Sequence, residues 1–358
     1  MTQPLWADGA SATRATASDL PFSAEVVIVG GGYTGLWTAY YLLRERPGAD
    51  VLVLEADHVG FGASGRNGGW VSALWPVSPD TLARHAGRAG AVAQLAALRD
   101  TVDEVGRVDA AEGFGSGFTK GGALVVARTP AQEERARASV AHSASWGGST
   151  TWLDAGATRE RLAVAVARGA TFTPDCARVH PRRLVDGLAG AVRRLGGRIV
   201  DGARVTRTGD RVVVLADGRR VSAGAVIHAT EGWSGTVSGQ GRRVVPVYSL
   251  MLATEVIDDA RWARIGLAGR EVFSDHGHVV IYGQRTGDGR IAFGGRGAPY
   301  HWGSAIRPEF DHDEAVFGAL RSTLRDLLPS STGWASPMPG VGRSASPATG
   351  TPRSRGTR

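Results

Sequence analysis

The chain has 358 residues, which is long enough for two domains that each bury a core of their own. Its hydrophobic share of 42% and charged share of 21% are ordinary for a soluble globular protein, and no apolar run approaches the ~18 residues needed to cross a bilayer. The formal net charge of +7 comes from Arg scattered among Asp and Glu, with Lys120 as the only Lys. We therefore interpret the charge as solvated faces rather than a nucleic-acid surface, and expect neither a nucleic-acid nor a membrane partner.

The first predicted unit is a β-α-β fold that follows a leader loop over residues 1–24. Residues 25–30 (EVVIVG) form a β-branched run typical of a buried parallel strand. Residues 33–46 have the apolar face of a helix, which the dipeptide Pro47-Gly48 ends, and residues 51–55 (VLVLE) predict a second strand. A unit of about 30 residues is the right size for half of a dinucleotide-binding fold.

The later elements alternate between helices and short strands. Residues 80–108 predict one or two helices, residues 124–127 a strand, and Thr129-Pro130-Ala131-Gln132 the capped start of another helix. A Pro-initiated helix is expected over 181–195. Further strands are expected at 198–200, 205, 212–215, 225–228, 244–255, 279–284 and 290–294, before a closing helix over 313–328.

The end of the chain differs in composition from the rest. Over residues 331–358, 18 of 28 positions are Pro, Gly, Ser or Thr, and Leu, Ile, Phe, Asp and Glu are absent. Such a segment buries too little apolar area to offset its ordering entropy, so we expect a disordered tail.

The turn between the first strand and the first helix carries a GxGxxG motif at Gly30, Gly32 and Gly35. The motif follows a strand, opens a helix, and is answered by Glu55 twenty residues after Gly35, so it predicts a dinucleotide site. Gly30 would permit the tight turn, Gly32 the approach of a diphosphate to the helix N-terminus, and Gly35 the packing of helix on strand. An ordinary glycine-rich turn is the alternative.

Two further features point to the nucleotide. Glu55 ends its strand, where a carboxylate can accept hydrogen bonds from both ribose hydroxyls and repel a 2′-phosphate. This position therefore favours FAD or NAD over NADP as the nucleotide. The alternative is that Glu55 is an ordinary solvated acidic residue. Residues 60–70 (GFGASGRNGGW) place Ser64, Arg66 and Asn67 among five glycines. This loop either presents backbone N–H groups to a planar ligand or is simply flexible, and its spacing does not decide between the two.

These segments resemble a known family. The runs VLVLEADHVGFGASGRNGG and ARVHPRRLVDGLAGAV are similar to the D-amino-acid-oxidase-like FAD-dependent oxidoreductases, over roughly residues 25–330. Within that family, HVVIYGQRTGDGRIAFGGRGAPYHWGS resembles the γ-glutamylputrescine oxidoreductase branch. The resemblance implies FAD as cofactor. The residues expected to bind it are Gly30, Gly31, Gly32, Tyr33, Thr34, Gly35, Glu55, Ala56, Ser64, Gly65, Arg66, Asn67, Gly68, Gly69, Val205, Ala229 and Thr230.

The resemblance also implies an α/β fold with two interleaved domains. A Rossmann-type FAD-binding domain would comprise residues 1–75 and 175–235, and a mixed-sheet substrate domain residues 76–174 and 236–330, ahead of the tail at 331–358. Glu231 occupies a position where a smaller residue is common in the family.

The implied activity is oxidation of the C–N bond of a small-molecule amine or amino acid. The α C–H would leave as hydride to flavin N5, the imine would hydrolyse, and the electrons would pass to oxygen or another acceptor. This chemistry needs little from side chains, so no catalytic residue is assigned. Candidates for the substrate side are Tyr248, Tyr282, Gln284 and Arg285, with ordinary sheet residues as the alternative. Strand alternation would send Tyr282 and Gln284 to one face and Arg285 to the other.

Other expectations concern location, metals and alternative functions. Cys176 is the only Cys, so no disulfide can form within the chain, which fits a cytoplasmic location. We expect no metal site, because His58, His180 and His228 lack the spacing of metal ligands. The family's closing strand, Gly-rich turn and last helix have no counterpart here, so we expect a truncated chain that binds FAD poorly; a genuine tail is the alternative. A nucleotide-binding module and an NAD-dependent dehydrogenase also remain open.

Overall fold

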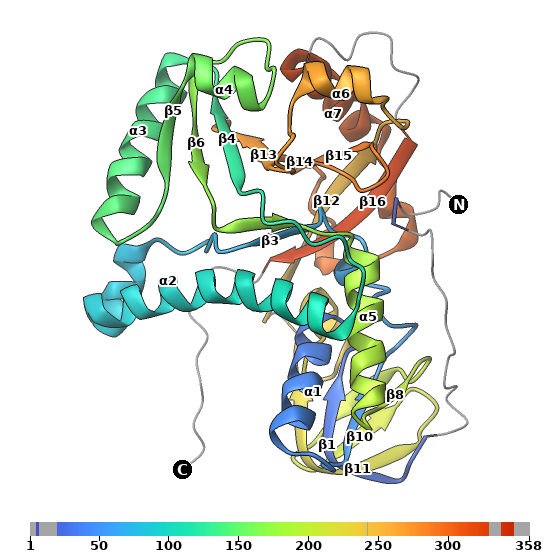
Figure 1. Cartoon of the computed structure of the whole chain (residues 1–358). Coiled ribbons are helices and arrows are strands. Elements are labelled where there is room, and N and C mark those ends of the chain that lie inside the picture. Colours follow the sequence, from blue (N-terminus) through green and yellow to red (C-terminus); the bar gives the residue numbers. More distant parts are fainter. Residues whose placement is uncertain (1–4, 7–19, 242, 329–337, 347–358) are drawn as a thin grey trace.

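The computed structural model describes residues 5–6, 20–241, 243–328 and 338–346. It is an α/β structure whose two large sheets lie in separate lobes, with the long helix α2 (Pro79–Glu112) passing between them (Figure 1). The predicted fold class is therefore confirmed.

The first sheet has six strands in the order β8 (Arg198–Val200), β2 (Val51–Leu54), β1 (Ser23–Val29), β11 (Arg220–His228), β10 (Val212–Leu215) and β9 (Val205–Thr208). The pairings β8–β2, β2–β1 and β1–β11 are parallel, whereas β11–β10 and β10–β9 are antiparallel. Because the central strands are parallel, their carboxyl ends meet at one edge, where open α/β sheets bind their ligands.

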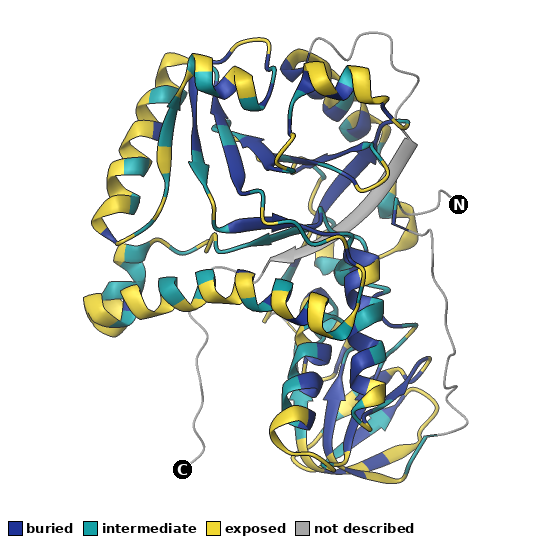
Figure 2. Cartoon of the chain, viewed as in Figure 1, coloured by how far each residue is buried: buried dark blue, intermediate teal, exposed yellow. Residues whose placement is uncertain are grey.

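Alternate residues of β1 bury on opposite faces of this sheet. Val26 and Ile28 pack against the helices α1 (Tyr33–Glu45) and α5 (Pro181–Arg194), whereas Val27 and Val29 join apolar residues of β10 and β11. Burial on both faces explains why this strand reads as a continuous apolar run. Figure 2 shows the same contrast, with buried strands inside and exposed outer faces on the helices.

The second sheet has eight strands in the order β16 (Met338–Ser346), β12 (Val245–Ala253), β15 (Ile291–Gly295), β14 (Ile281–Arg285), β13 (Val272–Asp275), β4 (Ala123–Ala127), β6 (Gly169–Thr173) and β5 (Thr151–Asp154). Its largest apolar cluster includes Phe273, Phe293 and Phe317, the last from α7 (Glu314–Leu327). A small third sheet pairs β3 (Trp70–Ser72) with β7 (Cys176–Arg178).

The other α-helices of the described residues are α3 (Pro130–Ser145), α4 (Ala155–Arg161) and α6 (Asp259–Ile265). The predicted start of α3 is confirmed, since the Thr129 hydroxyl accepts the backbone N–H of Gln132. The choice between one and two helices over 80–108 is also settled. Gly87 adopts φ 71° and ψ 168° within α2, so two helical segments meet there at a break.

Some elements were not predicted. The prediction missed the strands β3, β5, β6, β7 and β13 and the helices α4 and α6. The predicted disordered tail is wrong for Met338–Ser346, because this segment forms β16 and pairs antiparallel with β12 along its whole length. The rest of that tail, residues 331–337 and 347–358, lies outside the described residues, as do residues 1–4 and 7–19 of the leader. Within the described part of the chain, no helix is both long and apolar enough to span a membrane.

Candidate functional site

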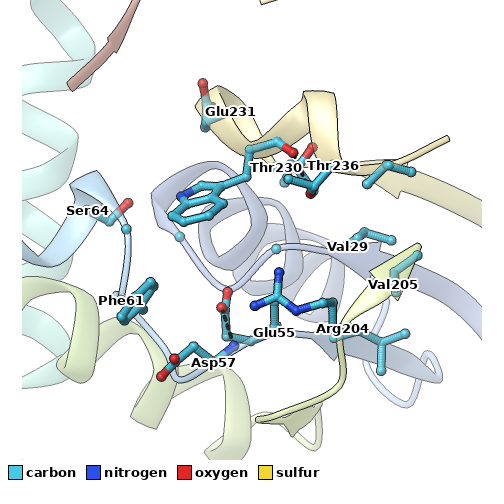
Figure 3. Close-up of a pocket in the computed structure, with 18 of the residues that line it drawn as sticks. Val29, Glu55, Asp57, Phe61, Ser64, Arg204, Val205, Thr230, Glu231 and Thr236 are labelled. Carbon is cyan, nitrogen blue, oxygen red and sulfur yellow. Dashed lines mark hydrogen bonds between the residues drawn. The ribbon is translucent and has the colours of Figure 1, made fainter. Parts of the chain in front are cut away.

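A narrow cavity of about 110 Å³, here called the nucleotide trough, lies at the carboxyl edge of the first sheet. Figure 3 shows Val205 toward one end and Ser64 toward the other, with Glu55 between them. The lining residues come from β1, β2, the loop after β2, the start of β9 and the turn after β11. They are Val29, Gly30, Gly32, Leu54, Glu55, Ala56, Asp57, Gly60, Phe61, Gly62, Ala63, Ser64, Ala203, Arg204, Val205, Ala229, Thr230, Glu231, Trp233, Thr236 and Val237.

The three motif glycines each occupy a position where a Cβ atom does not fit. Gly30 adopts φ +116°, and a Cβ there would lie 2.4 Å from the Ala229 carbonyl oxygen. A Cβ on Gly35 would lie 2.0 Å from the Gly30 carbonyl oxygen, so this glycine allows α1 to pack against the strand. A Cβ on Gly32 would lie 2.9 Å from Ser64 Oγ, at the wall of the trough. The sequence-based explanation of Gly30 and Gly35 is thus supported by close backbone contacts.

Glu55 faces the trough from the end of β2. Its Oε2 accepts the Gly31 backbone N–H at 2.7 Å and its Oε1 accepts the Asp57 N–H at 3.0 Å. Burial raises the pKa of Glu55 above its ordinary value, and these two hydrogen bonds oppose that rise. The carboxylate is therefore held firmly in place where a ribose would lie.

The N-terminus of α1 points toward the end of the trough that Ser64 occupies. Gly32 is the N-cap and makes no side-chain capping bond, while Ser64 Oγ accepts the backbone N–H of Tyr33 at 2.9 Å. The hydroxyl of Thr34 donates to Glu231 Oε1 at 2.6 Å. Glu231 adopts φ 45°, in the left-handed region that favours glycine. A glutamate in a left-handed backbone conformation therefore lies beside the place where a diphosphate would meet the helix.

The loop over residues 60–70 is fixed by several hydrogen bonds. The Asn67 side chain donates to the carbonyls of Ala63 and Ser64 at 3.1 and 3.0 Å and accepts the Gly69 N–H at 2.7 Å. The buried Trp6 indole donates to the Asn67 carbonyl at 2.9 Å. These contacts favour the interpretation of a shaped loop over that of a flexible one.

A larger cavity of about 610 Å³, here called the sheet cavity, adjoins the trough. Ala63, Ser64 and Glu231 line both, so the two spaces meet at these residues. The remaining lining residues are Tyr33, Thr34, Asn67, Gly68, Trp70, Leu74, Val125, Val247, Ser249, Ser274, Val280, Ile281, Tyr282 and Arg296.

Tyr282 connects the loop over residues 60–70 to the second sheet. Its ring lies in a slot between two glycines, because a Cβ on Gly68 or Gly294 would come within 2.7 or 2.4 Å of it. Its hydroxyl lies 2.9 Å from Ser249 Oγ. Burial raises the pKa of Tyr282, so the phenol stays protonated at neutral pH.

The other predicted substrate residues lie outside the two cavity linings. Gln284 is fully buried and donates to the carbonyls of Gly68 and Val179 at 2.7 and 3.3 Å, which anchors the loop over residues 60–70. Arg285 lies over the Trp262 ring at 4.4 Å. Tyr248 belongs to the core cluster of the second sheet, since alternation along β12 turns Ser249 toward the cavity instead. The predicted alternation of β14 holds, because Tyr282 and Gln284 both contact the loop and Arg285 does not.

Of the predicted cofactor residues, most line the trough or the sheet cavity. Those that do not are Gly31, Gly35, Gly65, Arg66 and Gly69. Arg66 instead pairs with Asp311 at 3.3 Å and lies over the Phe61 ring. Sequence reasoning missed several lining residues: Asp57, Phe61, Arg204, Trp233, Thr236, Val237, Trp70, Leu74, Val125, Ser249, Ser274 and Arg296. Three of them had a visible signal in the sequence: Phe61 and Trp70 lie in the run over residues 60–70, and Arg296 lies in the run GGRGAPY.

The geometry of the trough suits the adenosine diphosphate end of FAD. A glycine wall lets a diphosphate approach the N-terminus of α1, and a fixed carboxylate lies beside it for the ribose. The sheet cavity then offers room for a flavin ring and a substrate.

Comparison with known proteins agrees with this geometry. A family model described as FAD dependent oxidoreductase matches residues 25–357. The γ-glutamylputrescine oxidoreductase of Escherichia coli (strain K12) is 30% identical over 279 residues, which cover 76% of this chain and 64% of that protein. Among solved structures, L-proline dehydrogenase from P. horikoshii has a TM-score of 0.70 at 17% identity, covering 90% of this chain and 82% of that one. Glycine oxidase from Geobacillus kaustophilus has a TM-score of 0.69 at 19% identity, covering 90% and 83%.

The matches differ in how much of each protein they cover and in sequence identity. The chain spans 64% of the length of its E. coli relative, which is less than two thirds. The solved structures, all below 25% identity, share the fold. The family model covers most of the chain, and the cofactor of that family is FAD. The chain belongs to the FAD-dependent oxidoreductases of the D-amino-acid-oxidase type.

Proposed function

We propose that this protein oxidises the C–N bond of a small amine or amino acid with FAD as cofactor. The observation that carries the proposal is the junction at Ala63, Ser64 and Glu231, where the nucleotide trough opens into the sheet cavity. A dinucleotide bound along the trough would present its far end to that cavity. The names of the relatives support the substrate class, since they act on γ-glutamylputrescine, proline and glycine.

When bound, FAD supplies the acceptor for a hydride from the carbon next to nitrogen, and the resulting imine hydrolyses in water. The chain's own contribution is binding and positioning. Gly32, Ser64 and the N-terminus of α1 would hold the diphosphate, and Glu55 the ribose. The loop over residues 60–70 would border the ring system.

The sheet cavity would orient the substrate. Trp70, Val280 and Ile281 supply apolar walls around the hydroxyls of Tyr282 and Ser249. Because Tyr282 stays protonated at neutral pH, we assign it hydrogen bonding to the substrate and no role as a base. Arg296 adds a positive charge at the same cavity, which suits a substrate with an acidic group.

Of the alternatives, a nucleotide-binding module would need no second cavity, and an NAD-dependent dehydrogenase does not agree with the family's cofactor. The proposal includes transfer of the electrons to oxygen or another acceptor. We retain as proposals a cytoplasmic location and the absence of nucleic-acid and membrane partners.

The test begins with release and identification of the cofactor of the purified protein. A panel of primary, secondary and amino-acid amines follows, read by peroxide formation and, in parallel, by bleaching of an artificial electron acceptor. We expect FAD and turnover of at least one amine. Bound NAD, or FAD without turnover by either readout, would overturn the proposal.

A further inference from the structure

Arg178, at the end of β7, carries a buried positive charge that no described acidic side chain balances. The residue is 8% exposed, and its Nε is buried without a hydrogen-bond partner. None of its side-chain nitrogens forms a hydrogen bond or an ion pair with the residues that the structure describes. A guanidinium stays charged in proteins, and a buried charge without a partner is strongly unfavourable. The site therefore favours a ligand that supplies the missing negative charge.

The Nη1 end of Arg178 lies between two exposed glycines. A Cβ on Gly117, in the loop between α2 and β4, would lie 3.5 Å from this nitrogen. A Cβ on Gly287, in the turn after β14, would lie 3.6 Å from the same atom. Because neither residue has a side chain to cover Nη1, a small ion can reach it from solvent, whereas a larger molecule would meet backbone on both sides.

Arg270 brings a second guanidinium to the same turn. Its Nη1 donates to the carbonyl of Thr286, the residue before Gly287, at 3.2 Å. Arg270 adopts φ 61°, in the left-handed region that disfavours a residue with a side chain. Backbone strain of this kind persists only where the surrounding structure holds it, and it is concentrated at ligand sites. The strained turn thus places a second cation beside the first.

Arg285 adds a third positive charge nearby. Its guanidinium lies over the Trp262 ring at 4.4 Å, and its Nε is buried without a hydrogen-bond partner. Its ion pair is a long one, at 3.7 Å, with the fully exposed side chain of Asp259. Burial and the charges of Arg270 and Arg285 lower the pKa of Arg178, so the three guanidiniums lie close enough to repel one another.

Other acidic side chains near this cluster are already paired. Glu271 pairs with Arg161 at 3.3 Å, and Asp288 pairs with Arg290 at 2.9 Å. Asp259 therefore offsets at most one of the three guanidinium charges, which leaves two positive charges unbalanced. A monoanion would balance half of that excess, and a dianion would balance all of it.

We propose that Arg178 and Arg270 bind a small inorganic dianion of the phosphate or sulfate type at the turn over residues 286–289. Oxygens of the ion would accept hydrogen bonds from both guanidiniums, while Arg285 attracts the ion at longer range. The bound ion would join β7 to the turn after β14. Trp70 is the partner of Arg178 across β3 and β7 and lines the sheet cavity, so the ion would also stiffen one wall of that cavity. The inference does not depend on the proposed function.

The test follows thermal unfolding of the FAD-loaded protein as sulfate or phosphate replaces chloride at constant ionic strength. FAD occupies the nucleotide trough, where the N-terminus of α1 would also attract anions. Arg178→Met removes the buried charge and keeps a long side chain, and Arg270→Gln removes the second charge. Arg84→Met, on an exposed part of α2, is the matched control.

We expect the Tm of the wild type and of Arg84→Met to rise by about 2–5 °C at an anion concentration of about 100 times Kd. This rise should saturate and should be lost in Arg178→Met, whereas the general stabilising effect of sulfate does not saturate and acts on all variants alike. Without the anion, Arg178→Met should be at least as stable as the wild type, because it removes an unpaired buried charge. A saturable rise of equal size in Arg178→Met, or none in the wild type, would overturn the inference.

Calorimetry gives a second readout. Arg178→Met should weaken the binding of inorganic phosphate at least tenfold relative to Arg84→Met, and Arg270→Gln takes its place if that variant does not fold. Acetate, a monoanion, and phenyl phosphate, a bulky monoester, should each bind the wild type at least tenfold more weakly than phosphate.

Equal phosphate affinity in the test and control variants would refute the site, and equal affinity for phenyl phosphate would overturn its assignment to a free ion. If the protein retains no FAD, the same comparison is made on the apoprotein, where the nucleotide trough contributes equally to both variants.

Discussion

Replacing Glu231 separates a backbone effect from a charge effect at the cofactor site. This residue adopts φ 45°, which disfavours any side chain, and its carboxylate accepts the Thr34 hydroxyl at 2.6 Å beside the N-terminus of α1. Glu231→Gly removes the backbone strain and the negative charge together. Glu231→Gln keeps the strained backbone and removes the charge alone.

The effect on the folded apoprotein should be small. Releasing a left-handed residue gains about 1–2 kcal/mol. Against this, glycine loses about 0.5–1 kcal/mol more conformational entropy on folding, and the lost hydrogen bond with Thr34 costs about 0.5–1.5 kcal/mol. We therefore expect the free energy of unfolding of Glu231→Gly to stay within about 1 kcal/mol of the wild-type value.

The effect on FAD binding should be larger. A phosphate charge about 8 Å from a carboxylate is repelled by about 0.5 kcal/mol in water and about 2 kcal/mol at an effective dielectric constant of 20. Removing the carboxylate should lower the FAD dissociation constant about two- to thirtyfold, and salt should screen most of the gain. Titration of apoprotein by flavin fluorescence at low and high salt measures both effects. If Glu231→Gln binds FAD no more tightly at low salt, the carboxylate does not face the diphosphate and the reasoning fails.

Three further substitutions test the nucleotide trough. Burial raises the pKa of Glu55, so its ionisation costs folding free energy above that pKa and nothing below its ordinary value. In chemical unfolding, the stability of the wild-type apoprotein relative to Glu55→Gln should therefore be lower at pH 7 than below pH ~4, while at every pH the glutamine leaves one of the N–H groups of Gly31 and Asp57 without an acceptor. Glu55→Gln should also weaken FAD binding at least tenfold, and unchanged affinity would refute the ribose contact. Gly32→Val should give folded but colourless protein, and a full flavin complement would show that the glycine turn is not the diphosphate cradle. Gly35→Ala should lower the free energy of unfolding by about 1–3 kcal/mol or more, because its Cβ would lie 2.0 Å from the Gly30 carbonyl oxygen. The control is Gly318→Ala, on an exposed face of α7 with open space around it, which should raise the free energy of unfolding by about 0.5–1 kcal/mol. Similar thermal shifts in the two variants would contradict the packing argument.

The parts of the fold that the sequence predicts well are those fixed by short-range chemistry. The strand, glycine turn and helix over residues 25–46 depend on β-branched residues, on glycines and on a stop at Pro47-Gly48, all within a few positions of one another. The start of α3 is readable for the same reason, since Thr129 and Gln132 make its capping contacts locally.

The missed elements depend on partners that are distant in the sequence. β6 (GATFT) has no strong strand pattern of its own, yet it pairs with β4 on one side and β5 on the other. β16 has a composition typical of disorder, and it is ordered through backbone pairing with β12 across a separation of about 90 residues. Composition records neither of these pairings.

The contrast between local sequence and distant partners also explains which residues of the candidate site could be predicted. The residues Gly30, Gly32, Gly35 and Glu55, predicted to bind the nucleotide, lie close together because they belong to one β-α-β unit. Tyr248 was predicted to line the substrate side, but its neighbour Ser249 does so instead. Successive side chains of a strand point to opposite faces of the sheet, and the sequence does not show which face of β12 is turned toward the cavity. Leu74, Val125 and Arg296 come together only through the packing of the second sheet against the loop over residues 60–70.

That packing also ties the cofactor side to the substrate side. Tyr282 fills the slot that Gly68 and Gly294 leave open, and Gln284, two residues along the same face of β14, donates to the Gly68 carbonyl. One strand of the second sheet thus sets both the position of the loop that would border the flavin ring and the hydroxyl that lines the sheet cavity. If the two cavities bind as proposed, these contacts of β14 would set the distance between cofactor and substrate, and transfer between two bound molecules requires such precise positioning.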